Sequence, residues 1–139
     1  MMLPPRISRS SPAKSAAKEE AKVKREARSH VELIKMLPCC ATGKHGPSDP
    51  HHLMRVGPGE RGMGLTTAGR WTIPLCRKVH AEITPHGDPE AVLMERYGVD
   101  ARALASALWS VSPDIKAMQR LVQRATWDAR IRRGEQVLA

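Results

Sequence analysis

The chain has 139 residues, of which 41% are hydrophobic and only 3% aromatic, and it carries a formal net charge of +9. This length supports one domain of ordinary size with tails and a modest aliphatic core. A membrane-spanning helix is excluded because no apolar run approaches the roughly 20 residues that it needs. The first residues contain no apolar segment typical of a secretory signal, so we expect a cytoplasmic protein with reduced cysteines.

The positive charge is concentrated at the two ends of the chain. Residues 1–28 contain eight Lys and Arg against three acids (net +5), and residues 116–133 contain six against one (net +5). Residues 29–115 balance nine basic side chains against nine acidic ones. Basic flanks around a neutral centre are typical of proteins that bind a polyanion, although the same charge can serve solubility alone.

The N-terminal third is expected to be a tail followed by one long helix. Residues 1–12 are rich in Pro, Ser and Arg, which is typical of a disordered tail. A helix is expected from residue 13 to about residue 36. Its first half is nearly all Ala, Lys, Glu and Arg and should be solvated, whereas its second half gains apolar residues that can pack. Pro38 ends this helix, and residues 39–50 are turn-rich.

Two short strands are expected in the centre of the chain, at 51–56 and 71–75. A glycine-rich loop over 57–70 joins them. Pro74 places the second strand at a sheet edge or a strand end, because proline cannot donate a hydrogen bond to a neighbouring strand.

Four helices should follow the second strand, at about 76–85, 89–97, 100–109 and 113–133. Gly98 and Gly134 are expected to end the second and the fourth of these helices, because glycine readily adopts the left-handed conformation found there. Pro113 is expected at the first position of the fourth helix, where its missing N–H has no cost.

The side chains that can bind a metal are concentrated in the neutral centre. All three cysteines and five of the six histidines lie between Cys39 and His86. The order is the pair His51-His52, a strand, a loop, a strand and a helix that contains His80, which is the order that a ββα-metal site requires. We therefore expect a mixed α+β fold in which a small ββα-metal core with a short β-hairpin is surrounded by several helices and a basic N-terminal tail or helix.

Several short motifs occur in the order found in a known group of nucleases. They are LPC at 37–39, HHL at 51–53, GMG at 62–64, W-x-x-PLC at 71–76, a helix with a histidine, HG-x-x-E at 86–90 and ALW at 107–109. Over about residues 29–110 the sequence thereby resembles the phage and prophage HNH-like nucleases related to the recombination enhancement nuclease Ref. The resemblance implies a metal-dependent endonuclease that hydrolyses phosphodiester bonds in DNA, in phage or prophage recombination or DNA processing.

The resemblance also implies a role for each matching histidine. His51 would be a metal ligand in the catalytic centre, His52 the general base for the attacking water, and His80 the first ligand from the helix. An imidazole with its ordinary pKa of about 6.5 suits a base at neutral pH. Mg²⁺ or Mn²⁺ is the expected ion, with Zn²⁺ or Ni²⁺ as alternatives. The other interpretation of the pair is two loop histidines without a ligand, or a structural zinc site.

Some positions depart from the family pattern. The second helix ligand, normally four residues after the first, is replaced by Thr84. His86 would then have to curl back from beyond Pro85 to bind the metal, unless Thr84 or a water completes the shell. No Asn stands near Trp71, where the family places the residue that braces the hairpin, and Gly69 replaces a common Asp. The brace must come from elsewhere, or catalysis is weaker than usual.

Many relatives hold a structural zinc ion with paired Cys-x-x-Cys motifs. Here Thr42 and Val79 stand in place of the second cysteine of each pair. The remaining cysteines could share a zinc ion with a histidine such as His45; they are Cys39, Cys40 and Cys76. The alternative is that all three are small buried residues, which is common for reduced cysteine.

Basic side chains near the expected hairpin are candidates for contacts with DNA phosphates; they are Arg55, Arg61, Arg70, Arg77 and Lys78. The alternative is a flexible surface loop with ordinary arginines. We expect three parts in the chain: a basic, partly disordered or helical tail over 1–28, the nuclease domain over 29–110 and a basic C-terminal helix over 111–139.

Two functions compete on this evidence. The first is an endonuclease with DNA as its substrate. The second is a catalytically weakened DNA-binding accessory protein of recombination that keeps the HNH-like fold. The departures at Thr84, Gly69 and Val79 favour the second, and the intact histidines favour the first. Recombination proteins are candidate partners in both cases, and neither function requires a membrane.

The charge distribution predicts that binding to DNA is electrostatic and largely independent of sequence. Affinity should fall steeply with salt, and deleting residues 1–28 should flatten the slope of log affinity against log salt, because fewer counterions are released. Fluorescence anisotropy of a labelled duplex at several salt concentrations measures both slopes. An unchanged slope after the deletion would show that the N-terminal arm does not contact DNA.

Overall fold

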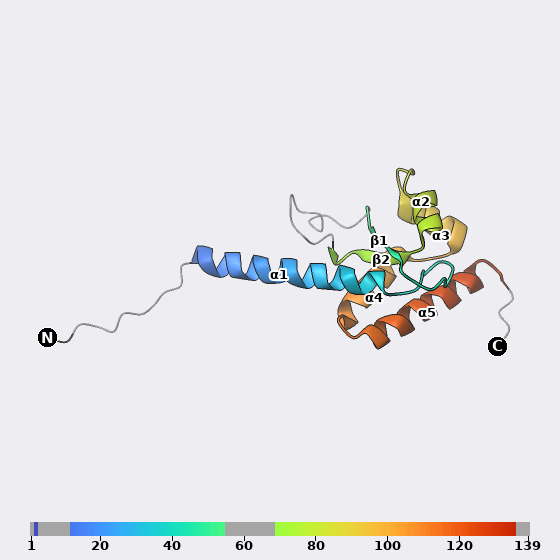
Figure 1. The fold of residues 1–139 in the computed structure, drawn as a ribbon. Helices are drawn as coiled ribbons and strands as arrows, with labels where there is room; N and C mark the ends of the chain where they lie inside the picture. Colours follow the sequence, from blue (N-terminus) through green and yellow to red (C-terminus); the bar gives the residue numbers. More distant parts are fainter. Residues whose placement is uncertain (1, 3–11, 55–68, 136–139) are drawn as a thin grey trace.

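A computed structural model describes residues 2, 12–54 and 69–135 of the chain. Within these residues five helices and one antiparallel two-stranded hairpin form a mixed α+β fold (Figure 1). In chain order the elements are α1 Pro12–Lys35, β1 Asp49–His52, β2 Thr72–Leu75, α2 Arg77–Ile83, α3 Pro89–Tyr97, α4 Ala101–Val111 and α5 Ile115–Arg132. Most of the expected disordered tail and of the glycine-rich loop lies outside the described residues.

Helix α1 has the two halves that its sequence predicts. Residues 13–23 are exposed, whereas Ala27, His30 and Ile34 are buried along one stripe. Ala27 lies so close to Gly69, three residues before β2, that a Cβ on Gly69 would sit 2.8 Å from the Ala27 Cβ. A side chain at position 69, such as the Asp that the resemblance leads us to expect there, would therefore clash with α1.

The first strand of the hairpin begins two residues earlier than expected, and it also ends earlier than expected. β1 starts at Asp49 and ends at His52 rather than spanning 51–56, and residues 55 and 56 lie outside the described part of the chain. The early start has a local cause, because the backbone N–H of Ser48 donates to Lys35 O at 2.9 Å and its hydroxyl donates to Leu37 O at 2.6 Å. These bonds hold the start of the strand against the end of α1.

The register of the hairpin places the two strand prolines opposite each other. Pro50 pairs with Pro74, and His51 pairs with Ile73. Each strand has a partner on one side only, so both are edge strands and a proline in each is tolerated. All four residues of β2 are buried, which shows that helices cover this hairpin on both faces.

Helices α3, α4 and α5 each begin with an aspartate N-cap. The carboxylates of Asp88, Asp100 and Asp114 each accept a hydrogen bond from the backbone N–H of the third residue of the helix, at 3.1–3.2 Å. The expected place of Pro113 at the first position of the last helix is therefore wrong. Pro113 precedes the Asp114 cap, and α5 begins at Ile115.

Glycines end two helices as expected. Gly98 has φ +75° at the end of α3, where a Cβ would meet the Ala129 carbonyl of α5 at 2.9 Å. Gly134, with φ +73°, follows α5. The fourth helix of the chain, α4, extends to Val111 instead of Trp109. The close approach at Gly98 places the end of α3 against α5, where Arg132 also donates a hydrogen bond to Gly98 O at 2.8 Å.

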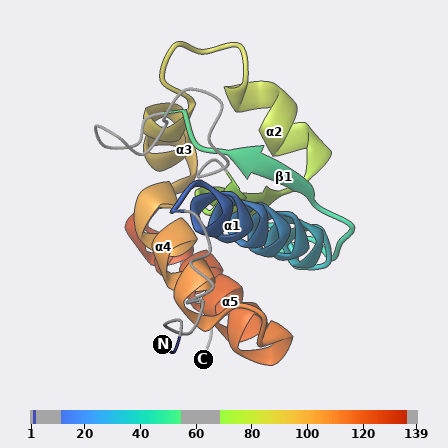
Figure 2. The ribbon, with the colours of Figure 1, turned by 90° about the vertical axis from the view of Figure 1, so that its left-hand side faces the viewer.

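The hairpin lies between two groups of helices. In both views α2 and α3 lie on one side of it, and α1, α4 and α5 lie on the other (Figures 1 and 2). The core between them is aliphatic, with Ile34, Ile73, Leu75 and Leu108 fully buried. In the described part of the chain, no helix is both long and apolar enough to cross a membrane.

One polar side chain is buried in this packing without a hydrogen bond. His30 is 1% exposed, and its ring meets that of Trp109 edge-on with the centroids 5.0 Å apart. Neither ring nitrogen has a hydrogen-bond partner among the described residues. Burial lowers the pKa of His30 from 6.5 to about 4, because the charged form loses its hydration.

His30 predicts a loss of stability in mild acid. Between pH 6.5 and about 4 the unfolded chain binds a proton at this histidine that the folded chain does not bind, so stability falls as the pH drops through this range. The loss should reach about 3 kcal/mol. Urea unfolding at pH 7.5, 6.0 and 4.5 measures it. His30→Leu should lose much of this pH dependence, while His45→Gln, at an exposed position, should keep it. Equal pH dependence in the two variants would contradict the prediction.

Candidate functional site

The structure brings the histidines of the motif region together. They line one pocket of about 270 Å³ between the hairpin and α2, together with four other residues. The residues that line it are Pro50, His51, His52, Met54, His80, Thr84, His86 and Pro89. The hairpin contributes His51 and His52, α2 contributes His80, and the turn after α2 contributes His86.

His51 and His80 form the centre of this pocket. Their rings are 5.3 Å apart between centroids and inclined by 75°. His51 is 4% exposed on β1, and His80 is half-buried on α2. The two rings meet because α2 follows β2 directly and packs back against β1, so that strand and helix face each other across the pocket.

Each of these two histidines has a carboxylate beside it that sequence reasoning missed. Asp49 Oδ2 lies 3.4 Å from His80 Nδ1, and Asp49 Oδ1 lies 3.7 Å from Arg77. Glu90 Oε1 lies 3.7 Å from His51 Nε2. Glu90 closes the HG-x-x-E motif, which was a usable signal. Nothing in the sequence around Asp49 singles it out, because its position depends on the register of the hairpin.

Glu90 also braces the hairpin, for which no Asn is available near Trp71. Its carboxylate accepts a hydrogen bond from the backbone N–H of Met54, just beyond β1. Burial, the largest influence, raises the pKa of Glu90, but the contacts with His51 and with the Met54 N–H together lower it below its usual value. On the other strand the Thr72 hydroxyl donates to Gly69 O at 2.8 Å. Hydrogen bonds thereby hold Met54 and Gly69, the described residues on either side of the connection between the strands.

Thr84 and His86 are the two candidates for a third metal ligand, and the structure gives them different surroundings. The Thr84 hydroxyl donates to the His80 carbonyl at 2.5 Å and ends α2. His86 is exposed beyond that helix and turns back to line the same pocket. Across residues 12–54 and 69–135, no three His, Cys, Asp or Glu side chains are arranged to hold a metal ion.

Two of the imidazoles nevertheless suit a metal ion. The Nε2 atom of His51 is buried, has no hydrogen-bond partner among the described residues and faces Glu90 Oε1 at 3.7 Å. The carboxylate of Asp49 at Nδ1 of His80 favours a proton on that nitrogen, which leaves the lone pair of Nε2 available. His51 and His80 thus fit as a two-histidine half-site, whereas the described residues do not place a third protein ligand beside them.

His52 faces a different direction from His51, as neighbours on a strand do. It is exposed, and its Nδ1 lies 3.4 Å from the Thr72 hydroxyl. Besides the histidine pocket it lines a second groove of about 370 Å³, to which α1 contributes Lys24, Arg28 and Glu32 among its polar residues. Sequence reasoning had not singled out these two cations, because it could not place α1 beside the hairpin.

The three cysteines lie in the hydrophobic core. All are reduced and buried, and the Thr42 hydroxyl contacts Cys76 Sγ at 3.9 Å. Burial raises the pKa of Cys39, but hydrogen bonds from Thr42 and from the backbone of Cys76 and neighbouring residues lower it below its usual value. The pKa of Cys40 is raised well above its usual value by burial. A shared zinc ion at these cysteines stays a prediction.

The candidate DNA contacts divide into three groups. Arg55 and Arg61 lie outside the described residues. Arg77 and Lys78 are exposed at the start of α2, beside the histidine pocket. Arg70 is exposed, and its guanidinium lies 5.3 Å from the centre of the Trp71 ring, which Arg102 approaches at 5.2 Å.

Comparison with known proteins gives two matches. Residues 3–111 match the family described as "Protein of unknown function (DUF968)". Over 69 residues, 50% of this chain, the sequence is 40% identical to a protein of Escherichia coli (strain K12) described as "Uncharacterized protein YdfU". That match covers 18% of the Escherichia coli protein, so this chain spans only a small part of its relative's length. No solved structure gives a significant match.

The double contact of Glu90 predicts that it stabilises the site. Glu90→Ala removes the acceptor of the Met54 N–H and the carboxylate beside His51, and should lower the free energy of unfolding by about 1–2 kcal/mol. Glu95→Ala is the matched control, since Glu95 is exposed on the same helix and should change stability by less than about 0.5 kcal/mol. Urea unfolding measures both, and equal values would show that Glu90 braces nothing.

Proposed function

This chain belongs to the DUF968 family, and we propose that it is a metal-dependent endonuclease that hydrolyses phosphodiester bonds in DNA. The observation that carries the proposal is the meeting of His51, His52 and His80 in one pocket between a hairpin and the helix after it. The carboxylate of Asp49 at Nδ1 of His80 adds support, because a histidine that binds a metal commonly donates its other ring N–H to a carboxylate.

His51 and His80 are the residues that would hold a divalent ion, Mg²⁺ or Mn²⁺ first, with Zn²⁺ or Ni²⁺ as alternatives. Such an ion, when bound, stabilises the charge that develops on the scissile phosphate and on the leaving 3′-oxygen. With His51 and His80 as its protein ligands, such an ion would take water and phosphate oxygens as its other ligands. Asp49 holds His80 in the tautomer that this role needs.

His52 is the proposed general base. The Thr72 hydroxyl gives its proton to Gly69 O, so the Thr72 oxygen acts as the acceptor toward Nδ1 of His52. Nδ1 then carries the proton of the neutral ring, and Nε2 is the basic nitrogen that accepts a proton from the attacking water. The exposed position of His52, at the border of the pocket and the neighbouring groove, allows a water to reach it.

The cations around the site support a polyanionic substrate. Lys24 and Arg28 line the groove on one side of His52, and Arg77 and Lys78 lie at the start of α2 on the other side of the hairpin. Contacts of this kind orient a phosphate backbone without reading its sequence. We place the reaction in the bacterial cytoplasm, on DNA undergoing phage or prophage recombination or processing, with recombination proteins as partners.

One observation favours the second function, a DNA-binding accessory protein of recombination with a weakened site. The hydroxyl proton of Thr84 is engaged by the carbonyl of its own helix, and a third protein ligand is not in place among the described residues. A site with two ligands binds a metal more weakly than a site with three. Cleavage assays therefore have to test several metals at high concentration.

Plasmid nicking with Mg²⁺, Mn²⁺, Ni²⁺ or Zn²⁺ tests the nuclease proposal. His52→Ala should keep metal affinity and lose on the order of 10²–10⁴-fold in rate, because it removes one acid–base group. His51→Ala should lose both metal binding and cleavage. His45→Ala is a matched control, since His45 is exposed away from the pocket. If the unaltered protein cleaves DNA with none of the four metals, the accessory function replaces the nuclease.

A further inference from the structure

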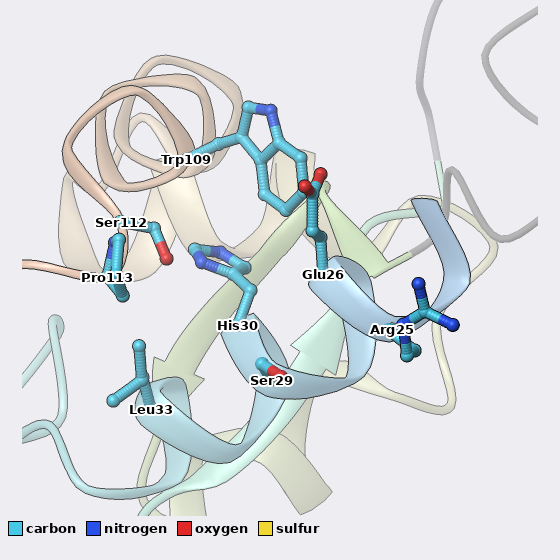
Figure 3. A pocket seen from close by; sticks show the side chains of 8 residues that line it. All are labelled: Arg25, Glu26, Ser29, His30, Leu33, Trp109, Ser112 and Pro113. Carbon is cyan, nitrogen blue, oxygen red and sulfur yellow. The ribbon is translucent and has the colours of Figure 1, made fainter. Parts of the chain in front are cut away.

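A further cavity lies on the side of α1 that faces away from the His52 groove. Its volume is about 670 Å³, within the range of sites that bind small ligands, and it opens between α1 and the end of α4 (Figure 3). Side chains of Arg25, Glu26, Ser29 and His30 line it from α1, and Trp109 and Ser112 line it from the opposite wall. None of these residues takes part in the histidine pocket.

The buried ring of His30 is the observation that points to a ligand in this cavity. Figure 3 shows its ring extending from α1 into the space between Trp109 and Ser112. The side chain is 1% exposed, and no described residue forms a hydrogen bond with either ring nitrogen. Leaving buried polar atoms unpaired costs free energy, so native proteins rarely do it without a functional reason. A ligand in the cavity would supply the missing partner.

The chemistry of the walls indicates which ligand fits. A neutral imidazole offers one donor and one acceptor, which matches the edge of a nucleobase. The indole ring of Trp109 offers a flat surface, and bases stack on such rings when they are not paired. Arg25 adds a cation that can contact a phosphate, and Ser29 and Ser112 add hydroxyl groups. Glu26 also lines the cavity, and its carboxylate, which lies beside Trp109 in Figure 3, can accept a hydrogen bond from an N–H group of a base. A flat heterocycle with an attached phosphate matches the imidazole, the indole and the guanidinium.

We propose that this cavity binds one unpaired nucleotide, with its base against Trp109 and His30 and its phosphate near Arg25. A nucleotide within a DNA strand is the favoured source, because Lys24 and Arg28 of the His52 groove alternate along α1 with Arg25 and Ser29 of this cavity. The two openings are therefore separated by one helix, about 10–12 Å across with its side chains. In this respect the inference rests on the proposed function, since the unpaired nucleotide would belong to the same substrate.

Binding without divalent metal tests the inference separately from cleavage. Fluorescence anisotropy in EDTA compares a labelled 12-nucleotide strand of deoxythymidine with a strand of equal length and charge that has abasic sites in place of the bases. The strand with bases should bind on the order of ten-fold more tightly, the gain expected from one stacked base. Equal affinities would overturn the inference without the use of any variant.

Variants of two residues of the cavity test whether the strand with bases binds there. Trp109→Leu and His30→Phe should each weaken the strand with bases by about ten-fold and leave duplex binding unchanged. Trp127→Leu is the matched control, since Trp127 is exposed on α5 outside this cavity, and it should leave both affinities unchanged. Thermal unfolding by circular dichroism checks that each variant folds. If neither cavity variant that folds lowers the affinity, the site lies elsewhere and the inference fails.

Free nucleotides identify the source of the ligand. Saturation-transfer NMR with thymidine 5′-monophosphate and with deoxyribose 5-phosphate separates recognition of the base from recognition of phosphate alone. Transfer to the base that disappears in Trp109→Leu supports the cavity as a nucleotide site, whereas equal signals from both compounds reduce it to a phosphate contact and overturn the proposal. If thymidine 5′-monophosphate binds at least as tightly as the 12-nucleotide strand, the ligand is a free nucleotide and the assignment to DNA is wrong. A protein that passes these tests but never cleaves DNA would refute only the nuclease proposal.

Discussion

A hairpin with four residues in each strand cannot stabilise itself in water, so the rest of this fold depends on how that hairpin is covered. Helices lie on both of its sides, and β2 is buried along its whole length. Covering one face with α2 brings His80 against His51. Covering the other face with α1 brings Lys24 and Arg28 beside His52. The candidate site is thus a direct consequence of burying a short hairpin.

The carboxylates of Asp49 and Glu90 connect this packing to chemistry. Each joins two elements, since Asp49 of β1 faces His80 of α2 and Glu90 of α3 faces His51 of β1. Buried and half-buried imidazoles next to carboxylates have defined orientations, which a solvated histidine lacks. The same contacts position the rings and join α2 and α3 to the strand, so the geometry of the site and the stability of the hairpin are coupled.

Local signals in the sequence predicted the helices well, because helix caps and the spacing of apolar side chains involve residues only a few positions apart. Gly98 and the helical stretch around His80 are examples, and the element order of hairpin and helix is also as predicted. The start of β1 depends on bonds from Ser48 to the end of α1, and the brace joins Glu90 to a backbone group 36 residues earlier. Such pairings follow from tertiary packing. The misplaced start of α5 is different, since Asp114 was a visible cap that the preceding proline obscured.

Helix α1 has a role that its composition does not reveal. Its buried stripe runs through Ala27 and His30, and successive residues on a helix point about 100° apart. Lys24 and Arg28 therefore face one side of the stripe while Arg25 and Ser29 face the other, and each side lines its own cavity. A helix docked by one narrow stripe places two sets of polar groups at fixed positions relative to the hairpin. If a nucleic acid strand lies across α1, the base that it presents to His30 determines which phosphate reaches His52.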